Sequence, residues 1–414
     1  KVILFLIQPA TSQMILFQKF DVLLQAKYGT KMVIDLDELN LIILAVGTVA
    51  ILAAFVVQVY YYLHYFSAII ADTRKRKRNN FSAHNSPTPP VSVIICARNE
   101  EDNLREFLPK VLEQDYPYFE VIVVNDASED NTSQVLDDFA KLYPRLYVTN
   151  IPNDINIISR KKLAVTVGVK AAKNELLLMT DADCYPASKD WIRSMVSNVT
   201  DGIEFVVGYG DYITERSIVN RLITYDTLFI AMQYMGFALR GKPYMAVGRN
   251  FLYRKSTFYK YKGFAGHLHI VSGDDDLLIN KAGNATNTAV ATRAESKTMS
   301  VAEPTMAKWL LQKSRHLTSS SLYTKSSRRR IGIEVVSRAI FYLLVVCGLA
   351  YADLYVSAFV LSLFVLRYAM QAVVINKTAK RLQSRRYSIS ILIFDIVLPV
   401  ISLWLMLKQR IRRR

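Results

Sequence analysis

Two aspartates one residue apart, Asp181 and Asp183, are the side chains in this sequence best suited to hold a metal ion. They directly follow residues 175–179, an apolar run of strand length, so both carboxylates emerge where a buried strand would end. Ligands of open α/β sheets bind at that edge. Paired carboxylates hold hard divalent cations such as Mg²⁺ or Mn²⁺, which bridge them to a diphosphate. The same pair is also compatible with a solvated surface loop. The surrounding sequence is therefore needed to distinguish a metal site from such a loop.

The elements around this pair alternate between strand and helix. Apolar runs predict buried strands, and amphipathic stretches between them predict helices. The expected strands are residues 91–97, 119–125, 146–151 and 175–180, and the expected helices are residues 100–114, 130–142 and 161–173. This alternation predicts a parallel sheet with right-handed crossovers, buried on both faces. The glycine motifs of dinucleotide dehydrogenases and P-loop NTPases are absent.

The charge distribution indicates a membrane protein. The chain has 414 residues, 51% of them hydrophobic, and a net charge of +17. The cations are bunched beside apolar segments, at residues 74–78, 328–330, 377–386 and 408–414. This positive-inside pattern accounts for the charge without a nucleic-acid partner. Three scattered cysteines are too few for a disulfide framework, which favours a reducing compartment for the soluble part.

Apolar segments divide the chain into five parts. Residues 39–71 carry no Asp, Glu, Lys or Arg and exceed the ~20 residues that a spanning helix needs, and tyrosines at their end suit an interfacial belt. Three further apolar segments cover residues 333–350, 355–375 and 388–407. The expected organisation is an N-terminal extension (1–38), a transmembrane helix (39–72), a basic and Pro-rich linker (73–90), a cytoplasmic domain (91–330) and a C-terminal membrane bundle (331–414). The first 31 residues are left out of the fold prediction.

Two charged residues, Arg367 and Asp395, interrupt the C-terminal apolar segments. At a rise of ~1.5 Å per residue both lie ~10–12 Å deep, so they are expected to pair, with independent snorkelling as the alternative. Three full spans would place the basic residues 408–414 outside, against the charge rule. The segment with Asp395 and Pro399 is therefore expected to be re-entrant or interfacial, with a cytoplasmic C-terminus.

Several motifs resemble those of membrane-bound family 2 glycosyltransferases. Residues 91–101 resemble their opening strand, with Cys96 where they usually have Pro. Residues 123–132 are similar to their Asp-Gly-Ser-x-Asp-x-Thr turn, with Ala127 in the Gly place. Lys161, with Ala164 and Gly168, resembles their Gly-Lys-Ala helix start.

The remaining motifs follow in the family's order, so the resemblance covers residues 92–320. Residues 180–184 resemble the metal motif, residues 248–250 the acceptor-side Gly-x-Asn, and residues 273–277 the catalytic-base segment. Residues 312–316 resemble Gln-x-x-Arg-Trp, but His316 stands in the Trp place.

The resemblance implies an α/β fold, with a GT-A (Rossmann-like) cytoplasmic domain, one N-terminal and two to three C-terminal transmembrane helices. It implies that Asp183, with Asp181, holds Mg²⁺ or Mn²⁺. Asp126 would accept the N3–H of uracil, with a turn or helix cap as its alternative role. The implied nucleotide-sugar contacts are Ala97, Arg98, Asn99, Glu100, Asp126, Lys161, Asp181, Gln312 and Arg315.

The acceptor hydroxyl must lose a proton as it attacks the sugar, which requires a carboxylate. Asp274 occupies the catalytic position by register, and Asp275 is the second choice; a solvated acidic turn is the alternative. Arg315 would meet the diphosphate and Gln312 the acceptor end, unless this stretch is only an amphipathic helix face.

The resemblance thus implies an inverting, metal-dependent glycosyltransferase. It would move a sugar from a nucleotide-sugar, with UDP as the expected nucleotide, to a lipid or lipid-linked glycan acceptor. The expected location is a bacterial cytoplasmic membrane, with the catalytic domain in the cytoplasm, membrane lipids as partners and no nucleic acid. The alternatives are a processive polysaccharide synthase coupled to translocation, which the His316 departure counts against, and a non-catalytic nucleotide-sugar-binding scaffold.

Overall fold

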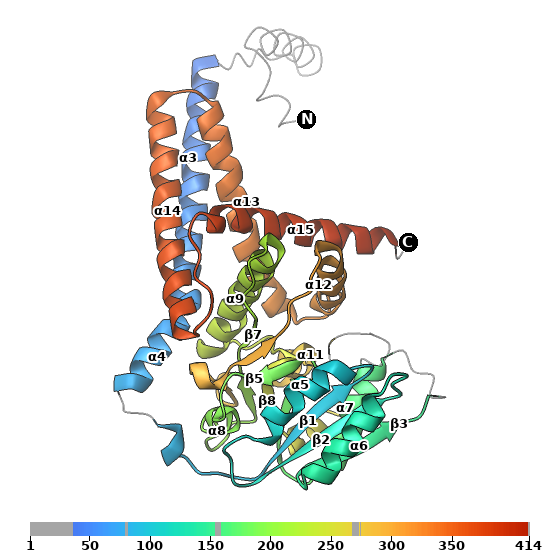
Figure 1. Ribbon diagram of the computed structural model, residues 1–414. Helices are drawn as coiled ribbons and strands as arrows, with labels where there is room; N and C mark the ends of the chain where they lie inside the picture. The colour runs from blue at the N-terminus through green and yellow to red at the C-terminus, as the bar shows by residue number, and fades with distance from the viewer. Residues whose placement is uncertain (1–35, 79–81, 154–158, 267–272, 274, 413–414) are drawn as a thin grey trace.

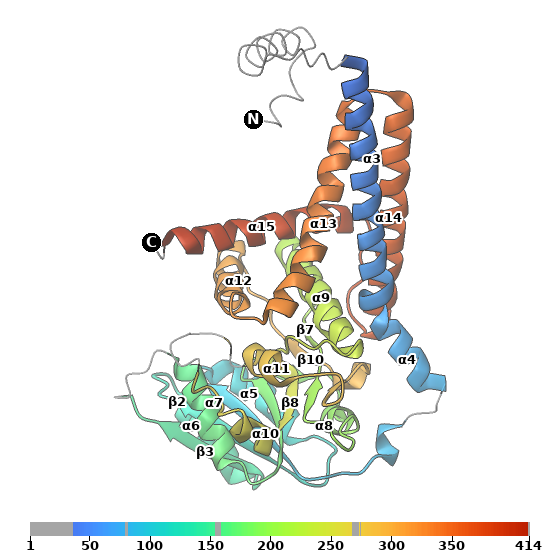
Figure 2. The same ribbon diagram turned by 180° about the vertical axis from the view of Figure 1, so that it is seen from behind.

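The structure is a computed structural model that describes residues 36–78, 82–153, 159–266, 273 and 275–412 (Figure 1). An α/β domain lies at one end of a bundle of long helices, and Figure 2 shows the same arrangement from behind.

A seven-stranded sheet forms the centre of the α/β domain, in the order β3-β2-β1-β4-β8-β6-β9. The first four strands are mutually parallel and match the predicted ones to within a residue at either end. They are β1 (Val91–Ala97), β2 (Phe119–Asp126), β3 (Leu146–Ile151) and β4 (Leu176–Asp181).

The other half of the sheet corrects the expectation of a wholly parallel sheet. Strand β8 (Phe251–Arg254) is antiparallel both to β4 and to β6 (Phe205–Val207), and β9 (Thr288–Val290) is parallel to β6. Met179, near the carboxyl end of β4, pairs with Phe251 at the start of β8. The chain therefore enters β8 at the carboxyl edge of the sheet and runs against β4.

A second, three-stranded sheet adjoins the carboxyl edge of the first. Its order is β5 (Cys184–Pro186), β10 (Thr298–Ser300) and β7 (Gly210–Tyr212). Strand β10 is antiparallel to β5, with Ser300 opposite Cys184, and parallel to β7. This pairing brings residue 300 beside the predicted metal motif.

Helices cover both faces of the large sheet. Alternate side chains of β1 and β2, such as Ile94 and Ile122, pack against α7 (Arg160–Ala171). The intervening ones, such as Val93 and Val121, pack on the opposite face. That face is covered by α5 (Glu101–Leu112), α6 (Thr132–Leu142) and α8 (Trp191–Val196). The prediction of strands buried on both faces is confirmed.

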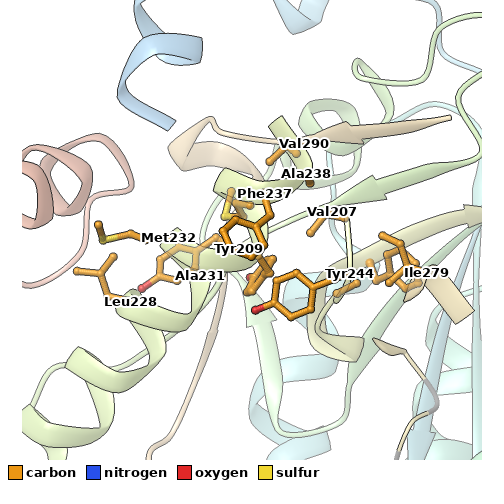
Figure 3. Close-up of a cluster of buried hydrophobic side chains, with 14 of the residues drawn as sticks. Val207, Tyr209, Leu228, Ala231, Met232, Phe237, Ala238, Tyr244, Ile279 and Val290 are labelled. Atoms are coloured by element: carbon orange, nitrogen blue, oxygen red, sulfur yellow. The ribbon is translucent and has the colours of Figure 1, made fainter. Parts of the chain in front are cut away.

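Helix α9 (Ile218–Leu239) was not anticipated from the sequence. It is apolar and long enough to cross a membrane, yet most of it is buried within the protein. Figure 3 shows its Leu228, Met232 and Phe237 in a buried cluster that also contains Tyr244 and Ile279. Helix α9 is therefore part of the core of the α/β domain.

The remaining short elements connect these layers. They are the 3-10 turns Ala83–Asn85, Gly248–Asn250 and Ala294–Ser296, and the helices α10 (Lys255–Lys260), α11 (Asp276–Ala282) and α12 (Met306–Ser320).

Four other helices of the described chain are also long and apolar enough to cross a membrane. The first comprises α3 (Leu36–Tyr60), a π-helical turn (Tyr61–Phe66) and α4 (Ala68–Arg78); the others are α13 (Lys325–Ala350), α14 (Leu354–Arg381) and α15 (Ser390–Arg412). Helices α3, α13 and α14 lie side by side in both views (Figures 1 and 2), with Ile51, Phe341 and Val360 buried along their seam.

The N-terminal helix differs from its prediction at its C-terminal end, around residues 61–66. Tyr61, Tyr62 and Tyr65 are buried, and two of them contact Phe237 of α9, so they do not form an exposed interfacial belt. A Cβ atom on Gly236 would lie 2.3 Å from the Tyr65 carbonyl oxygen, so glycine is what permits this close contact. The basic residues 74–78 continue the helix as α4 and are not part of the linker.

Helix α15 runs across the direction of α13 and α14 in both views and lies next to α12 and α9 (Figures 1 and 2). Gln409 of α15 donates to the Ser314 carbonyl of α12 at 2.5 Å. Phe394 and Leu398 are buried, whereas an apolar stripe on the other side is exposed at Ile389, Ile393, Ile396, Val400, Leu403, Leu407 and Ile411. The spacing of three or four residues puts this stripe on one face.

Arg367 and Asp395 form the predicted pair, with Nη2 2.9 Å from Oδ2, and both are buried. The pair belongs to a larger network that the sequence did not indicate. Arg338 of α13 contacts Asp395 at 3.0 Å and Glu334 at 3.1 Å. Gln58 of α3 accepts from Arg367 at 2.8 Å. The network holds two acids and two arginines and joins all four long helices.

Candidate active site

The candidate site lies at the carboxyl ends of β1, β2 and β4. Strand β1 stands between β2 and β4, so the strand order reverses there, and ligands of open α/β sheets bind in the crevice at such a reversal. The register aligns Cys96 with Asp181, and Ala97 with Asn125. The loops that follow the three strands therefore meet at one place.

Asp181 is the last residue of β4, and its side chain is 32% exposed. Its Oδ1 accepts a hydrogen bond from Nζ of Lys161, on α7, at 2.9 Å. Burial opposes ionisation of this carboxyl, but Lys161, with contributions from Arg249 and His316, holds its pKa below the usual value. Asp181 is consequently ionised at neutral pH.

Asp183 lies two residues further on, and its hydrogen-bond partners among the described residues are neutral donors. Its Oδ1 accepts from the Cys184 thiol at 3.2 Å, and its Oδ2 accepts from the Ser300 hydroxyl at 3.4 Å. Burial, together with the charge of Asp181, raises the pKa of Asp183. A cation bound between the two aspartates would relieve this repulsion.

The donor set fits a hard cation. Within the described chain, one group of acidic, Cys or His side chains could hold a metal ion. It consists of Asp181, Asp183 and Cys184, whose potential ligand atoms lie within 4.8 Å of one another. Burial raises the pKa of the Cys184 thiol well above its usual value, so this sulfur stays protonated and donates to Asp183. Two carboxylates without a thiolate suit Mg²⁺ or Mn²⁺ better than a soft metal.

A pocket adjoins Asp181 on the side of β8. Polar groups of Lys161, Asp181, Gly248 and Asp275 line it, together with Cys96, Val165, Met179, Thr180, Phe251 and Tyr253. Asp275 is the N-cap residue of α11. It accepts from the backbone N–H of Asp276 at 2.7 Å through Oδ1, while its Oδ2 accepts from the Gly248 N–H. The bond to Gly248 joins Asp275 and the Gly248 turn at the Asp181 pocket.

The other members of the triplet differ from Asp275. Asp274 lies outside the described residues. Asp276 is buried and accepts from the hydroxyls of Ser319 and Tyr323, each at 2.6 Å, which ties α11 to the end of α12. Asp276 therefore has a packing role, and Asp275 lines the pocket.

The loops after β1 and β2 are tied together. The Asn99 N–H donates to the Ser128 hydroxyl at 3.0 Å, and the Asn99 side-chain oxygen accepts from the Glu129 N–H at 2.8 Å. Ala127 has φ of 50°, a left-handed conformation that favours glycine, and it stands where the resembling family has Gly. Ala97 is buried at the end of β1, and Arg98 is exposed beside it.

Asp126 and Glu100 flank this crevice. Asp126 ends β2 and is buried, and both of its contacts with the Arg160 guanidinium, at 2.7 and 2.9 Å, fall on Oδ1. Burial raises the pKa of Glu100, and the charges of Asp183 and Asp181 add to that effect, whereas the hydrogen bond from Asn103 opposes it. Glu100 is thus within electrostatic reach of the candidate metal ligands.

Helix α12 carries the other predicted contacts. Gln312 is half-buried, and Arg315 and His316 are exposed. Among the causes that hold the pKa of Asp181 down is the electrostatic effect of His316, so this part of α12 lies within electrostatic reach of the site. Trp309 is buried, with the Lys313 ammonium 5.4 Å from its ring centroid, and therefore packs inside the domain.

Two residues that sequence reasoning did not assign belong to this region. Ser300 donates to Asp183 from a strand more than a hundred residues downstream, and no local pattern marks it. Arg249 stacks over the Tyr212 ring at 4.4 Å and donates to the Gly210 carbonyl at 2.9 Å. Arg249 is the middle residue of the Gly-x-Asn motif, and this motif is the sequence feature that could have indicated its place in the site.

Asn250, the last residue of that motif, faces the interior. Its side-chain oxygen accepts from the Trp191 indole at 3.1 Å, and its amide donates to the carbonyls of Tyr209 and Ser296 at 2.8 and 2.7 Å. All three contacts lie within the domain, so this amide braces the two sheets against each other.

Comparison with known proteins identifies the family of this domain. Residues 92–262 match the family described as Glycosyl transferase family 2. Together with the strand order, this match places the α/β domain in the GT-A fold class.

Curated relatives include a dolichyl-phosphate beta-glucosyltransferase of Trichomonas vaginalis, 29% identical over 167 residues, which cover 36% of this chain and 48% of the relative. A poly-beta-1,6-N-acetyl-D-glucosamine synthase of Staphylococcus epidermidis is 32% identical over 93 residues, 22% of this chain and 21% of the relative. The matched region thus spans less than half the length of either relative.

Among solved structures, the mannosyltransferase PcManGT of Pyrobaculum calidifontis, in complex with GDP-Man and Mn²⁺, is 16% identical with a TM-score of 0.47. The match covers 80% of this chain and 99% of that one.

Proposed function

The chain carries a glycosyl transferase family 2 domain, and on this premise we propose that the protein is an inverting, metal-dependent glycosyltransferase of a membrane. It transfers a sugar from a nucleotide-sugar, with UDP as its nucleotide, to a lipid or lipid-linked glycan. The observation that carries the proposal is that Asp181 lines one pocket with Asp275 and lies beside Asp183, at the point where the strand order reverses.

On the donor side, Asp181 and Asp183 would hold Mg²⁺ or Mn²⁺, which offsets the negative charge that builds on the departing diphosphate. The Lys161 ammonium and the exposed Arg315 guanidinium offer further positive charge to the diphosphate. Arg160 occupies one oxygen of Asp126, which leaves the other to accept the N3–H of uracil.

On the acceptor side, one carboxylate of the acidic triplet removes the proton of the attacking hydroxyl. A bond forms between the acceptor oxygen and the anomeric carbon while the bond from that carbon to the diphosphate oxygen breaks, so the configuration inverts. We assign the base to Asp274 on its place in the family motif. Both oxygens of Asp275 accept from backbone N–H groups, which suits a residue that positions the turn.

The membrane helices support a lipid or lipid-linked acceptor. Helix α12, which carries the Gln312–His316 motif, lies against α15, whose exposed face is apolar. An acceptor held in a bilayer beside α15 would therefore present its head group near the site. The basic runs at residues 74–78, in α4, and 328–330, in the first turns of α13, favour a cytoplasmic domain, and we propose a bacterial cytoplasmic membrane as the location.

Processive polymer synthesis with translocation receives less support. The seam between α3, α13 and α14 is filled by buried side chains, including those of Ile51, Phe341 and Val360. The exposed His316 also replaces the aromatic residue expected at the acceptor end.

The proposal is tested with the purified full-length protein and a panel of UDP- and GDP-sugars, with Mn²⁺, Mg²⁺ or a chelator. We expect release of the nucleoside diphosphate from one UDP-sugar, and no release in the presence of the chelator. Asp183→Ala provides the inactive control. Binding of a donor without turnover under any metal condition would instead favour a scaffold, and turnover of a GDP-sugar alone would overturn the assignment of UDP.

A further inference from the structure

A groove lies at the end of α14 that adjoins the α/β domain. Five α14 residues line it, and Arg386 of the loop between α14 and α15 completes it; the α14 residues are Ala372, Val373, Asn376, Lys377 and Lys380. The exposed wall of the groove is almost entirely apolar, although half of its lining residues are cationic. The aliphatic stems therefore form the wall, and the charged ends stand where water reaches them.

The three cations of the groove lack acidic partners. Lys377, Lys380 and Arg386 are exposed, and none of them forms an ion pair with any residue of the described chain. The adjacent Arg385 differs, since its guanidinium donates to the Glu215 carbonyl at 3.1 Å. Three like charges around one groove repel one another, so an anion there would stabilise the arrangement.

The groove is held in shape by hydrogen bonds beneath it. The Asn376 amide donates to the Tyr387 carbonyl at 2.7 Å, and the Tyr387 N–H donates to the Asn376 oxygen at 2.8 Å. The buried Tyr387 hydroxyl bonds the Thr224 hydroxyl of α9 at 2.9 Å. The backbone that carries Arg386 is consequently held beside the lysine-bearing end of α14.

The position of the groove indicates which anion it suits. It lies where the apolar part of α14 gives way to the basic end of that helix. Exposed apolar residues of α14, among them Leu366 and Val373, precede the two lysines along the helix. A ligand that fits has an apolar chain beside Val373 and an anionic group between the cations, which are the two parts of an anionic phospholipid.

We propose that this groove binds the phosphate-bearing head group of an anionic phospholipid. Such a lipid would also link the bundle to the catalytic domain, because the same loop contacts that domain. Nζ of Lys297 donates to the Gln383 carbonyl at 2.8 Å and to Asp211 of β7 at 3.4 Å. A ligand that binds only the folded state stabilises it by mass action, so lipid binding should raise the melting temperature.

The test uses the full-length protein in a neutral detergent, titrated with phosphatidylglycerol or phosphatidylcholine. Native mass spectrometry counts the bound lipid, and melting temperature reports stabilisation. We expect selective binding of phosphatidylglycerol. Its affinity should be at least tenfold weaker in K377Q/K380Q/R386Q, since each cation near an anionic head group makes a similar contribution to the binding free energy. The matched control K325Q/R328Q/R329Q removes the same charge from exposed positions at the start of α13 and should change affinity by less than about twofold.

A second variant tests the groove without a change of charge. Val373 is 49% exposed, so Val373→Trp should fold normally while its ring fills the groove and weakens phosphatidylglycerol binding. Equal losses in the two triple variants, or equal binding of the two lipids, would overturn the proposal. Displacement of phosphatidylglycerol by millimolar inorganic phosphate would also overturn it, in favour of a soluble anion.

Discussion

The molecule contains two clusters of carboxylates that differ in how their charge is balanced. In the bundle, Glu334 and Asp395 face Arg338 and Arg367, and all four side chains are buried. At the edge of the sheet, Asp181 has Lys161 as its ion-pair partner, whereas Asp183 is contacted by a thiol and a hydroxyl.

This difference separates a structural role from a binding role. A buried network with equal numbers of acids and bases satisfies its own charges and fixes the helices that carry them, but it has no charge left for a ligand. In the acidic pair beside the pocket, Asp183 has no ion-pair partner among the described residues, so its carboxylate can attract a metal ion.

Asp183→Ala should abolish metal-dependent donor binding while the protein still folds, because the loss of a ligand removes most of a two-carboxylate cation site. Donor affinity is measured by titration with and without Mn²⁺. Asp201→Ala, at an exposed turn, serves as the control. A variant whose donor affinity still rises normally with Mn²⁺ would place Asp183 outside the site.

Asp274→Asn should reduce sugar transfer at least about a hundredfold, since removal of a general base typically costs ~10²–10⁴ in rate. Donor and metal binding should be retained. Asp275→Asn should have a milder effect, because its oxygens hold backbone N–H groups. The measurement is transfer rate beside donor affinity, and near-normal transfer by Asp274→Asn would reject the assignment.

Asp395→Asn leaves two buried arginines with one acid, and Arg367→Gln leaves two acids with one arginine. Each should destabilise the protein by roughly 3–5 kcal/mol, the usual cost of a buried charge that has lost its partner. The double change leaves Arg338 with Glu334 and should recover much of the stability. Melting temperature and folded yield report the result, and additive losses in the double variant would contradict a shared network.

Ser300→Ala should weaken Mn²⁺ affinity by up to about tenfold, because groups that orient a metal ligand typically contribute 10–100-fold and this hydrogen bond is long at 3.4 Å. Folding should be unaffected. Isothermal titration with Mn²⁺ measures the change, with Ser128→Ala as a control that also removes a hydroxyl in the crevice region. Unchanged affinity would show that Asp183 needs no support from β10.

A cysteine added after Arg414 should stay unlabelled by an impermeant reagent in intact cells. This follows if α15 lies along the cytoplasmic face with its stripe toward lipid, and the change should leave activity intact. Leu354→Cys, at the exposed first residue of α14, should be labelled as the positive control. Labelling of the C-terminal cysteine would mean that α15 crosses the membrane.

The sequence determined the half of the domain that local patterns encode. The four parallel strands and the helices between them carry apolar runs and amphipathic periods, so their bounds were predictable to within two residues. The short strands β6, β8 and β9 have three or four residues each, too few for a period to show, and α9 is buried on most sides and therefore lacks an amphipathic pattern.

Within the two clusters the division is similar. The sequence placed Asp181 and Asp183 at a strand end and paired Arg367 with Asp395, because strand length and helical depth are local quantities. The tertiary structure alone brought Ser300 to Asp183, and Arg338 with Glu334 to Asp395. Most of these contacts join segments that are far apart along the chain. They depend on how the two sheets and the four long helices pack, which no spacing within one segment specifies.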